Sequence, residues 1–296
     1  MICNFFSKAF GVCCMLLACH ALSQEKTPLQ YAATEVADGL YMLEGVGGFT
    51  GGNIALSVGD DGVVMIDDGI PKALDSMLQA IKRITDRPVD FLINTHFHWD
   101  HAGNNGPMAK AGARIFAHEN ARQRLRKELG KSRGNALPVF TFSQEMRFYL
   151  NGNDTHIVHV PHAHTDGDVV IHFKNLNVIH TGDVYIKGLF PYIDLDSGCI
   201  ISGMIEAIHI ILALTDTNTK IIPGHGRLAT KADLEATAAM LEQSKAIIGQ
   251  LVTQGKSEKE VIALNPLSQF KAWGWHFIHL EKMTQQVYRS LVAQSE

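Results

Sequence analysis

The sequence predicts an α/β fold in which two β-sheets pack face to face and helices cover both outer sides, a four-layer αββα sandwich. Two observations predict it. From about Tyr41 to the C-terminus, short apolar runs of strand length alternate with longer amphipathic stretches of helix length. A group of strands followed by helices occurs once in each half of the chain, which indicates two sheets with helices outside them. Since no repeat or Pro/Ser-rich linker divides the chain, residues 24–296 are expected to form one domain.

In the first half, strands are predicted where short apolar or β-branched runs are bounded by turn residues, at 41–44, 53–58, 62–66, 90–94 and 114–117. The Asp-Gly pair at positions 61 and 62 predicts a hairpin, because it is a strong two-residue turn signal. A helical period predicts helices at 72–84, with Pro71 in the first turn, and at 120–129.

The second half follows the same plan without repeating the sequence. Strands are predicted at 157–160, 169–173, 178–180 and 220–222. Helices are predicted at 200–214, 231–253 and 277–292, the first of them apolar enough to be buried. On this assignment His276 and His279 lie at or near one helix, three residues apart, and are interpreted as packing or surface residues.

Residues 1–23 are predicted to be a secretory signal peptide. A lysine precedes an apolar run at 9–19, and small residues at 21–23 favour cleavage before Gln24. This run is too short to span a bilayer, so no stable membrane insertion is expected after cleavage. A lipoprotein signal ending at Cys19 is one alternative and a disordered start is another. The expected location is secreted or periplasmic.

Charge limits the kinds of partner that are expected, and cysteine content limits the possible disulfides. The formal net charge of -4 comes with no Lys/Arg-rich run, so nucleic acid is not an expected partner and a small-molecule substrate is. Four of the five cysteines precede Gln24, which leaves Cys199, interpreted as a buried apolar residue. A single cysteine forms no internal disulfide. The oligomeric state is not indicated.

The strongest motif is the run from Thr95 to His101, Thr-His-Phe-His-Trp-Asp-His. It directly follows a predicted strand, so it occupies a loop at the strand's carboxyl end. His96 and His98 point to one side of an extended chain, and a turn brings Asp100 and His101 to a second position. Four ligands in six residues suit two adjacent metal ions better than one. Imidazole with carboxylate favours zinc, with iron or manganese as alternatives.

Three later segments carry further metal-binding residue types. They are Pro-His-Ala-His-Thr-Asp-Gly at 161–167, His-Thr-Gly-Asp at 180–183 and Pro-Gly-His-Gly at 223–226. Each lies just after a short apolar run, so several strand ends are expected to converge on one edge of the sandwich. The glycines of the last segment allow a tight bend around the imidazole.

Together, in this order, the four motifs resemble the metallo-β-lactamase superfamily, over residues 41–227. The resemblance implies that His96, His98 and His164 bind a first metal ion. It also implies that a second ion is bound by a separate set of side chains, namely Asp100, His101 and His225. Asp183 matches the carboxylate that bridges both ions in glyoxalase-II-like and lactonase-like members. Asp67 matches the buried aspartate that supports the metal-binding loop.

Two metal ions about 3.5–4 Å apart can share a water and generate a hydroxide that attacks a carbonyl carbon. The predicted protein is therefore a zinc-dependent hydrolase that opens an amide or ester bond. Asp100 is the predicted catalytic residue, because it can orient the nucleophile and receive its proton.

Two weaker hypotheses concern substrate contacts. Phe49 lies in the glycine-rich segment 45–52, which similar proteins use as a flap over the site; a plain flexible turn is the alternative. Lys187 lies four residues after Asp183, near the position where one lactamase subclass has a lysine for the substrate carboxylate, but its offset differs by one.

The leading expectation for the substrate is a β-lactam, because export and the Pro-Gly-His-Gly ending resemble secreted β-lactamases. Asp183 favours the alternative, a thioester, lactone or other ester. Phosphodiester or sulfate ester cleavage and a non-catalytic protein stabilised by metal are the remote alternatives.

Overall fold

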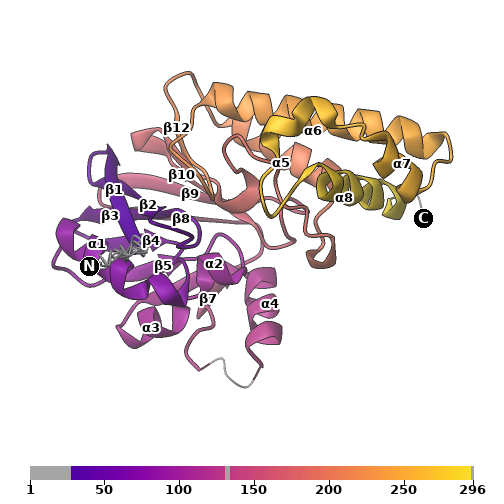
Figure 1. Cartoon of the computed structure of the whole chain (residues 1–296). Coiled ribbons are helices and arrows are strands. Elements are labelled where there is room, and N and C mark those ends of the chain that lie inside the picture. The colour runs from indigo at the N-terminus through magenta and orange to yellow at the C-terminus, as the bar shows by residue number, and fades with distance from the viewer. Residues whose placement is uncertain (1–27, 131–133, 295–296) are drawn as a thin grey trace, which may run out of the picture.

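The structure is a computed structural model that describes residues 28–130 and 134–294 (Figure 1). The predicted signal peptide lies outside the described residues. Within those residues, no helix combines the length and the apolar character that a membrane crossing requires.

The described strands form two sheets. The first sheet follows chain order, and its strands are β1 (Gln30–Ala37), β2 (Leu40–Val46), β3 (Ile54–Gly59), β4 (Gly62–Ile66), β5 (Phe91–Ile93), β6 (Arg114–His118) and β7 (Phe140–Phe142). Its pairs are antiparallel as far as β4 and parallel from there on. The second sheet has the order β12 (Lys220–Ile222), β11 (Val178–His180), β10 (Val169–Phe173), β9 (Asn153–His159), β8 (Glu145–Leu150), and only β11 and β12 pair in parallel.

Helices cover the outer side of each sheet (Figure 1). Those of the first half are α1 (Leu74–Ile84), α2 (Trp99–Ala102), α3 (Asn105–Lys110) and α4 (Glu119–Leu129). Those of the second half are α5 (Ile201–Ala213), α6 (Lys231–Thr253), α7 (Glu258–Leu264) and α8 (Leu280–Ala293). Helix α6 begins with a capping box, in which Thr230 and Asp233 bond each other's backbone N–H groups.

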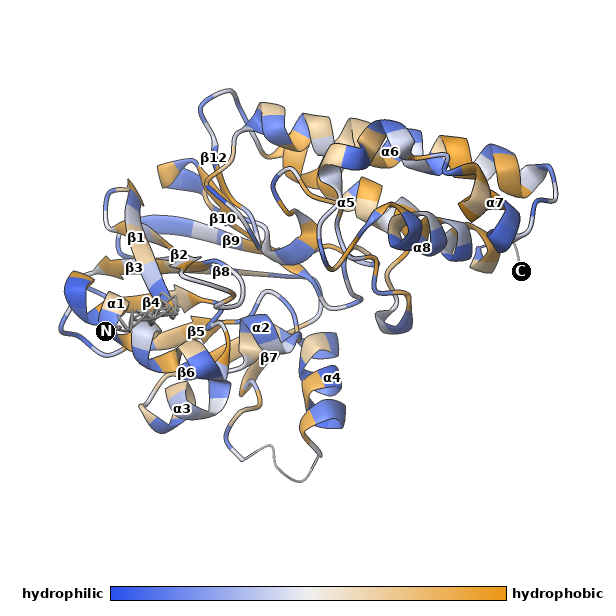
Figure 2. Cartoon of the chain, in the orientation of Figure 1, coloured by the Kyte–Doolittle hydropathy of each residue, from blue (hydrophilic) through white to orange (hydrophobic). Residues whose placement is uncertain are grey.

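Side-chain alternation along the strands produces three apolar layers between the four layers of structure. In β4, Val63 and Met65 pack with the buried residues of α1, whereas Val64 and Ile66 pack with the second sheet. In β12, Ile221 belongs to the apolar layer under α5, α6 and α8, whereas Ile222 faces the first sheet. Figure 2 shows apolar residues along the strands and a mixture of polar and apolar residues on α6 and α8. The predicted αββα fold is confirmed.

The predicted elements are found within a few residues of their expected bounds. The differences are strands that were missed, short helices that were missed and one helix that begins later than predicted. The sequence prediction missed β1, β7 and β8, and the short helices α2, α3 and α7. Strand β8 alternates between exposed and half-buried residues, so it lacks the apolar run that marked the other strands.

The prediction of a helix from residue 277 is wrong at its start. Helix α8 begins at Leu280, because His279 has extended backbone angles and its side chain accepts the N–H of Lys282 as an N-cap. The apolar residues Phe277 and Ile278 continued the helical pattern in the sequence but lie in the preceding loop. His276 and His279 therefore do not lie within a helix.

Candidate metal centre

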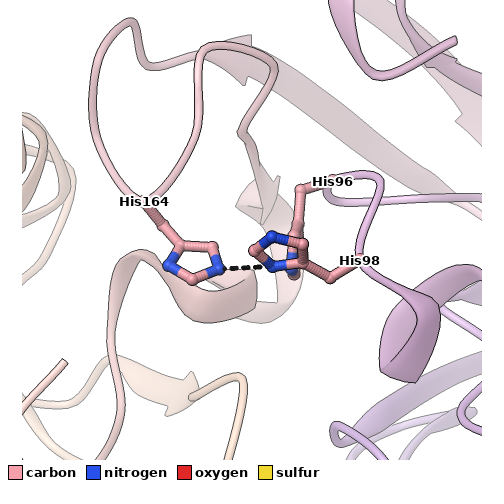
Figure 3. A group of neighbouring side chains, drawn as sticks. All are labelled: His96, His98 and His164. Atoms are coloured by element: carbon pink, nitrogen blue, oxygen red, sulfur yellow. Dashed lines mark hydrogen bonds between the residues drawn. The ribbon is translucent and has the colours of Figure 1, made fainter. Parts of the chain in front are cut away.

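The first histidine group is built from two loops (Figure 3). His96 and His98 follow the carboxyl end of β5, and His164 lies in the turn between β9 and β10. One nitrogen of each ring lies within 4.8 Å of the others. The three side chains are thus brought together as the motifs predicted, and they can hold one metal ion.

The ring orientation of His96 is set by its neighbour. Its Nδ1 lies 3.0 Å from the hydroxyl oxygen of Thr95, which in turn donates to Asp67 Oδ2 at 2.7 Å. A hydroxyl that donates to a carboxylate accepts from Nδ1, so the proton of His96 is on Nδ1. Its Nε2 is buried and has no hydrogen-bond partner among the described residues. Such an orphaned acceptor suits a metal ligand.

The other two histidines are fixed in the same way. Nε2 of His98 lies 3.0 Å from Asp194 Oδ2, and Nδ1 of His164 lies 2.8 Å from the carbonyl oxygen of Tyr192. The remaining nitrogens, His98 Nδ1 and His164 Nε2, face each other at 2.8 Å, the dashed line in Figure 3. Metal-binding histidines characteristically have the second ring nitrogen bonded to a carboxylate or carbonyl.

Burial favours the neutral form of His96 and His164. Burial, aided by neighbouring His101, holds the pKa of His96 well below its ordinary value. Burial and the adjacent His98 lower the pKa of His164 to about 4. Neutral imidazole is the form that binds a metal ion.

The second group consists of Asp100, His101, Asp183 and His225, with donor atoms within 4.8 Å of one another. Asp183 Oδ1 lies 3.0 Å from His101 Nε2 and 3.4 Å from His225 Nε2. Asp100 Oδ2 lies 3.3 Å from His225 Nε2. Two carboxylates and two imidazoles supply the donor types that zinc takes.

Asp183 also reaches the first group, because its Oδ2 lies 3.7 Å from His164 Nε2. Its carboxylate is therefore between the two groups, where one side chain can serve two ions. Burial opposes ionisation, but His225 and His101 outweigh burial and hold the pKa of Asp183 well below its usual range. Burial likewise opposes protonation of His225, yet Asp183 and Asp100 raise its pKa to about 9. These attractions indicate a place that favours a cation.

Asp67 positions donors of both groups. Its carboxylate is fully buried, accepts the N–H of Thr95 at 2.7 Å and lies 2.7 Å from His101 Nδ1. With Nδ1 engaged, His101 directs Nε2 at Asp183. Asp67 has a left-handed backbone, with φ of 62°, a conformation that Asp tolerates better than most residues.

Two glycines leave room for the donors. A Cβ at Gly224 would lie 2.0 Å from Asp183 Oδ1, and a Cβ at Gly52 would lie 2.1 Å from His101 Cε1. Neither position has space for a side chain.

The donors open into a cavity of about 310 Å³. It is lined by metal-site residues and by aromatic side chains: Phe49, His98, Trp99, Asp100, His164, Asp183, Ile186, Tyr192, His225, Trp275, His276 and Phe277. The predicted flap residue Phe49 is 49% exposed, and its ring stacks on His225 with centroids 5.8 Å apart. It therefore borders the cavity.

Lys187 is not at the cavity. Its Nζ lies 3.0 Å from Asp233 Oδ2 and donates to the carbonyl oxygen of Leu228 at 3.0 Å. Both polar contacts of the Lys187 side chain are thus with α6 and with the loop that precedes it. The structure does not support the hypothesis that Lys187 contacts the substrate.

Several site residues escaped the sequence analysis. Asp168 accepts the N–H groups of His164 and Thr165, each at 2.6 Å, and so shapes the turn that presents His164. Asp194 orients His98 from 96 positions away in the sequence. His276 is exposed, as predicted for a surface residue, and it also lines the cavity, which the sequence analysis did not foresee. The contact of Asp194 joins segments far apart in the chain, so local sequence gives no signal for it, whereas Asp168 acts within its own turn.

Comparison with known proteins agrees with this geometry. The family model described as the metallo-beta-lactamase superfamily matches residues 47–230. Hydroxyacylglutathione hydrolase of Pelagibacter ubique is 26% identical over 153 residues, which cover 49% of this chain and 56% of that protein. Metallo-beta-lactamase IND-1 of Chryseobacterium indologenes is 23% identical over 183 residues, 62% of this chain and 74% of that protein.

Among solved structures, a metallo-beta-lactamase from Pontibacter korlensis superposes with a TM-score of 0.62 at 19% identity, over 72% of this chain and 99% of that chain. The DIM-1 metallo-beta-lactamase gives a TM-score of 0.59 at 13% identity, over 72% and 97%. These similarities show the same fold. With the matched family model and the paired His/Asp groups, they confirm the resemblance seen in the motifs: the chain belongs to the metallo-beta-lactamase superfamily, whose members are typically metal-dependent hydrolases.

Proposed function

We propose that the protein is a di-zinc hydrolase that cleaves carboxylic esters, thioesters or lactones, with iron or manganese as alternative metals. The observation that carries this proposal is the location of Asp183. Its carboxylate contacts His101 at 3.0 Å on one side and lies 3.7 Å from His164 on the other. A carboxylate that serves both groups supports a site for two ions. Hydroxyacylglutathione hydrolase, by its name a hydrolase of an acyl-glutathione, is among the relatives.

The chain's own residues divide the work at this site. Bound divalent ions supply a water of lowered pKa and polarise the carbonyl group of the substrate. Asp100 is 15% exposed in its side chain and lines the cavity, so it can orient the attacking water and accept its proton. Phe49 and Trp99 lie beside Asp100 in the cavity wall, with ring centroids 5.9 Å apart, and give that side of the cavity an apolar surface.

Hydrolysis of β-lactams is the second candidate. It is supported by the match to metallo-beta-lactamase IND-1 over 74% of that protein. The contacts of Lys187 weaken it, because the lysine expected to meet a substrate carboxylate pairs with Asp233. We therefore rank it below ester and thioester hydrolysis.

The test compares zinc-loaded protein on a thioester, a lactone, a simple ester and a chromogenic cephalosporin under one set of conditions. We expect turnover of at least one of the first three, abolished by chelation and restored by zinc. An Asp100→Asn variant should lose turnover while a matched Asp86→Asn variant, at an exposed carboxylate, retains it. Turnover of the cephalosporin alone would reverse the ranking, and no turnover of any substrate would refute the proposed function.

We also propose that the chain is exported and that cleavage before Gln24 releases a catalytic domain of residues 24–296. N-terminal sequencing of the protein secreted by a bacterial host checks both points. A processed chain beginning at Gln24 is expected. A lipid-modified chain beginning at Cys19 would indicate the lipoprotein alternative, and an unprocessed chain would contradict export.

A further inference from the structure

One wall of the cavity comes from a part of the chain beyond residue 230, where the family match ends. Trp275, His276 and Phe277 line the cavity from the loop that precedes α8. The residues that carry the donors lie within the matched range, so this wall is an addition of the C-terminal region. Walls added to a conserved reaction centre are where substrate selectivity arises.

This loop is firmly attached. Phe190 donates its N–H to the carbonyl oxygen of Trp273 at 2.8 Å, and Trp275 Nε1 donates back to the carbonyl oxygen of Phe190 at 3.0 Å. The N–H of Trp275 also bonds the carbonyl oxygen of Ile278, which is fully buried in the core under α5 and α8. The aromatic wall is therefore preorganised, which lowers the entropy cost of binding a ligand.

The wall is continuous with the first histidine group. The ring of Phe277 meets the ring of Tyr192 edge-on, with a centroid distance of 5.3 Å. It also contacts the ring of Trp275 at a tilted angle, with a centroid distance of 5.5 Å. Tyr192 in turn lies 6.0 Å from the ring of His164. An aromatic surface thus leads from Phe277 through Tyr192 to the donors of the first group.

The wall itself carries no lysine or arginine side chain, and a neighbouring lysine contacts its rings. The cavity-lining residues of the described chain include no lysine or arginine. The Nζ of Lys282 lies 3.7 Å from the ring centroid of Phe277 and 5.2 Å from that of Tyr192, so this lysine makes cation–π contacts with two rings of the wall and is not itself part of the lining. A buried anionic group without a partner is costly, whereas an aromatic group gains from ring–ring contact.

From these contacts we infer that Tyr192, Trp275 and Phe277 form a subsite for an uncharged aromatic group of the substrate, next to the bond that is hydrolysed. The inference rests on the proposed function, because it names the substrate class of the same site. It makes Trp275 and Phe277 specificity-determining residues.

The kinetic test uses three esters that differ in one group: methyl acetate, methyl phenylacetate and methyl 4-carboxyphenylacetate. We expect kcat/KM for methyl phenylacetate to exceed that for methyl acetate by about tenfold or more, and the carboxylated ester to be the poorer of the two aromatic esters. In Phe277→Ala and Trp275→Ala, the ratio of kcat/KM for methyl phenylacetate to that for methyl acetate should fall toward one. Trp275→Phe should retain most of this ratio. Tyr149→Ala removes an aromatic side chain that is 70% exposed on β8, away from the cavity, and is the matched control.

A binding measurement separates this inference from the proposed function. Benzyl methyl ketone, a non-hydrolysable probe with the same aromatic group, is titrated calorimetrically into the zinc-loaded protein. We expect Kd to rise about tenfold in Phe277→Ala and to stay constant in Tyr149→Ala. If no substrate is turned over but the ketone binds in this way, the proposed function fails and the subsite stands.

Three outcomes overturn the inference. The first is turnover with no preference for the aromatic ester together with an unchanged Kd in Phe277→Ala. The second is an equal loss of turnover on methyl acetate and methyl phenylacetate in the variants, which indicates a structural role. The third is a preference for the carboxylated ester that disappears in Lys282→Ala, which would make the wall an anion site.

Discussion

Asp67 Oδ2 lies 2.7 Å from Nδ1 of His101, and both side chains are completely buried. The same carboxylate accepts the N–H and the hydroxyl of Thr95, whose hydroxyl orients His96. One aspartate therefore fixes the ring of one donor in each group. Contacts of this kind set the affinity of a metal site although they never touch the ion.

Asp67→Asn should weaken metal binding about 10–100-fold and lower turnover, because a neutral amide holds the His101 imidazole less firmly than a carboxylate does. Asp68→Asn is the matched control. Burial raises the pKa of Asp68 well above its usual value, which favours the neutral form of this carboxyl, so we expect an amide to be tolerated there. Zinc titration against a competing chelator measures both. An Asp67→Asn variant with wild-type zinc affinity would contradict the role.

Protein purified without chelators should contain two zinc ions per chain by metal analysis. His164→Ala and His225→Ala should each lower the count by about one, because the two residues belong to different donor groups. Zinc should also raise Tm, since a ligand that binds only the folded state stabilises it. A count of one or less in the wild-type protein would refute the two-ion site.

Asp183→Asn should reduce turnover by about 100-fold or more and lose the second ion first, because the amide oxygen is a poorer ligand than a carboxylate oxygen. Metal analysis and steady-state kinetics on the same preparation check this. If the variant kept both ions and full activity, Asp183 would be a structural residue at the end of β11.

Asp194→Asn should lower the affinity of the first group for zinc about 10-fold, since the 3.0 Å contact with His98 Nε2 holds that ring in place. Asp196→Asn changes a carboxylate two residues away, in the same short 3-10 turn, without touching His98 and should have no effect. A similar loss in both variants would point to the turn itself and not to the contact.

Lys187→Ala should change KM by less than about threefold, and equally for charged and neutral substrates. The lysine pairs with Asp233, and both side chains are about one third exposed, a setting in which ion pairs contribute roughly 0–1 kcal/mol. A rise of about tenfold in KM confined to carboxylate substrates would instead restore the β-lactam interpretation.

The sequence predicted those parts of the site whose signals are local. The run from His96 to His101 and the short motifs around His164, Asp183 and His225 each follow an apolar strand, and the structure brings them together. Asp194 and Phe277 could not be found in this way, because their roles come from contacts between segments far apart in the chain. The helix predicted from residue 277 shows the same limit, since only the fold reveals that His279 caps it.

The origin of the donors has a mechanical consequence. The loop after β5 in the first sheet supplies His96, His98, Asp100 and His101, and the second sheet's connections supply His164, Asp183 and His225. Ions bound at these donors would therefore act as a reversible cross-link between the two halves of the sandwich, over separations of 66 residues and more. While such ions were held, neither sheet could unfold on its own without breaking the centre, so metal binding would couple the two halves into one cooperative unit.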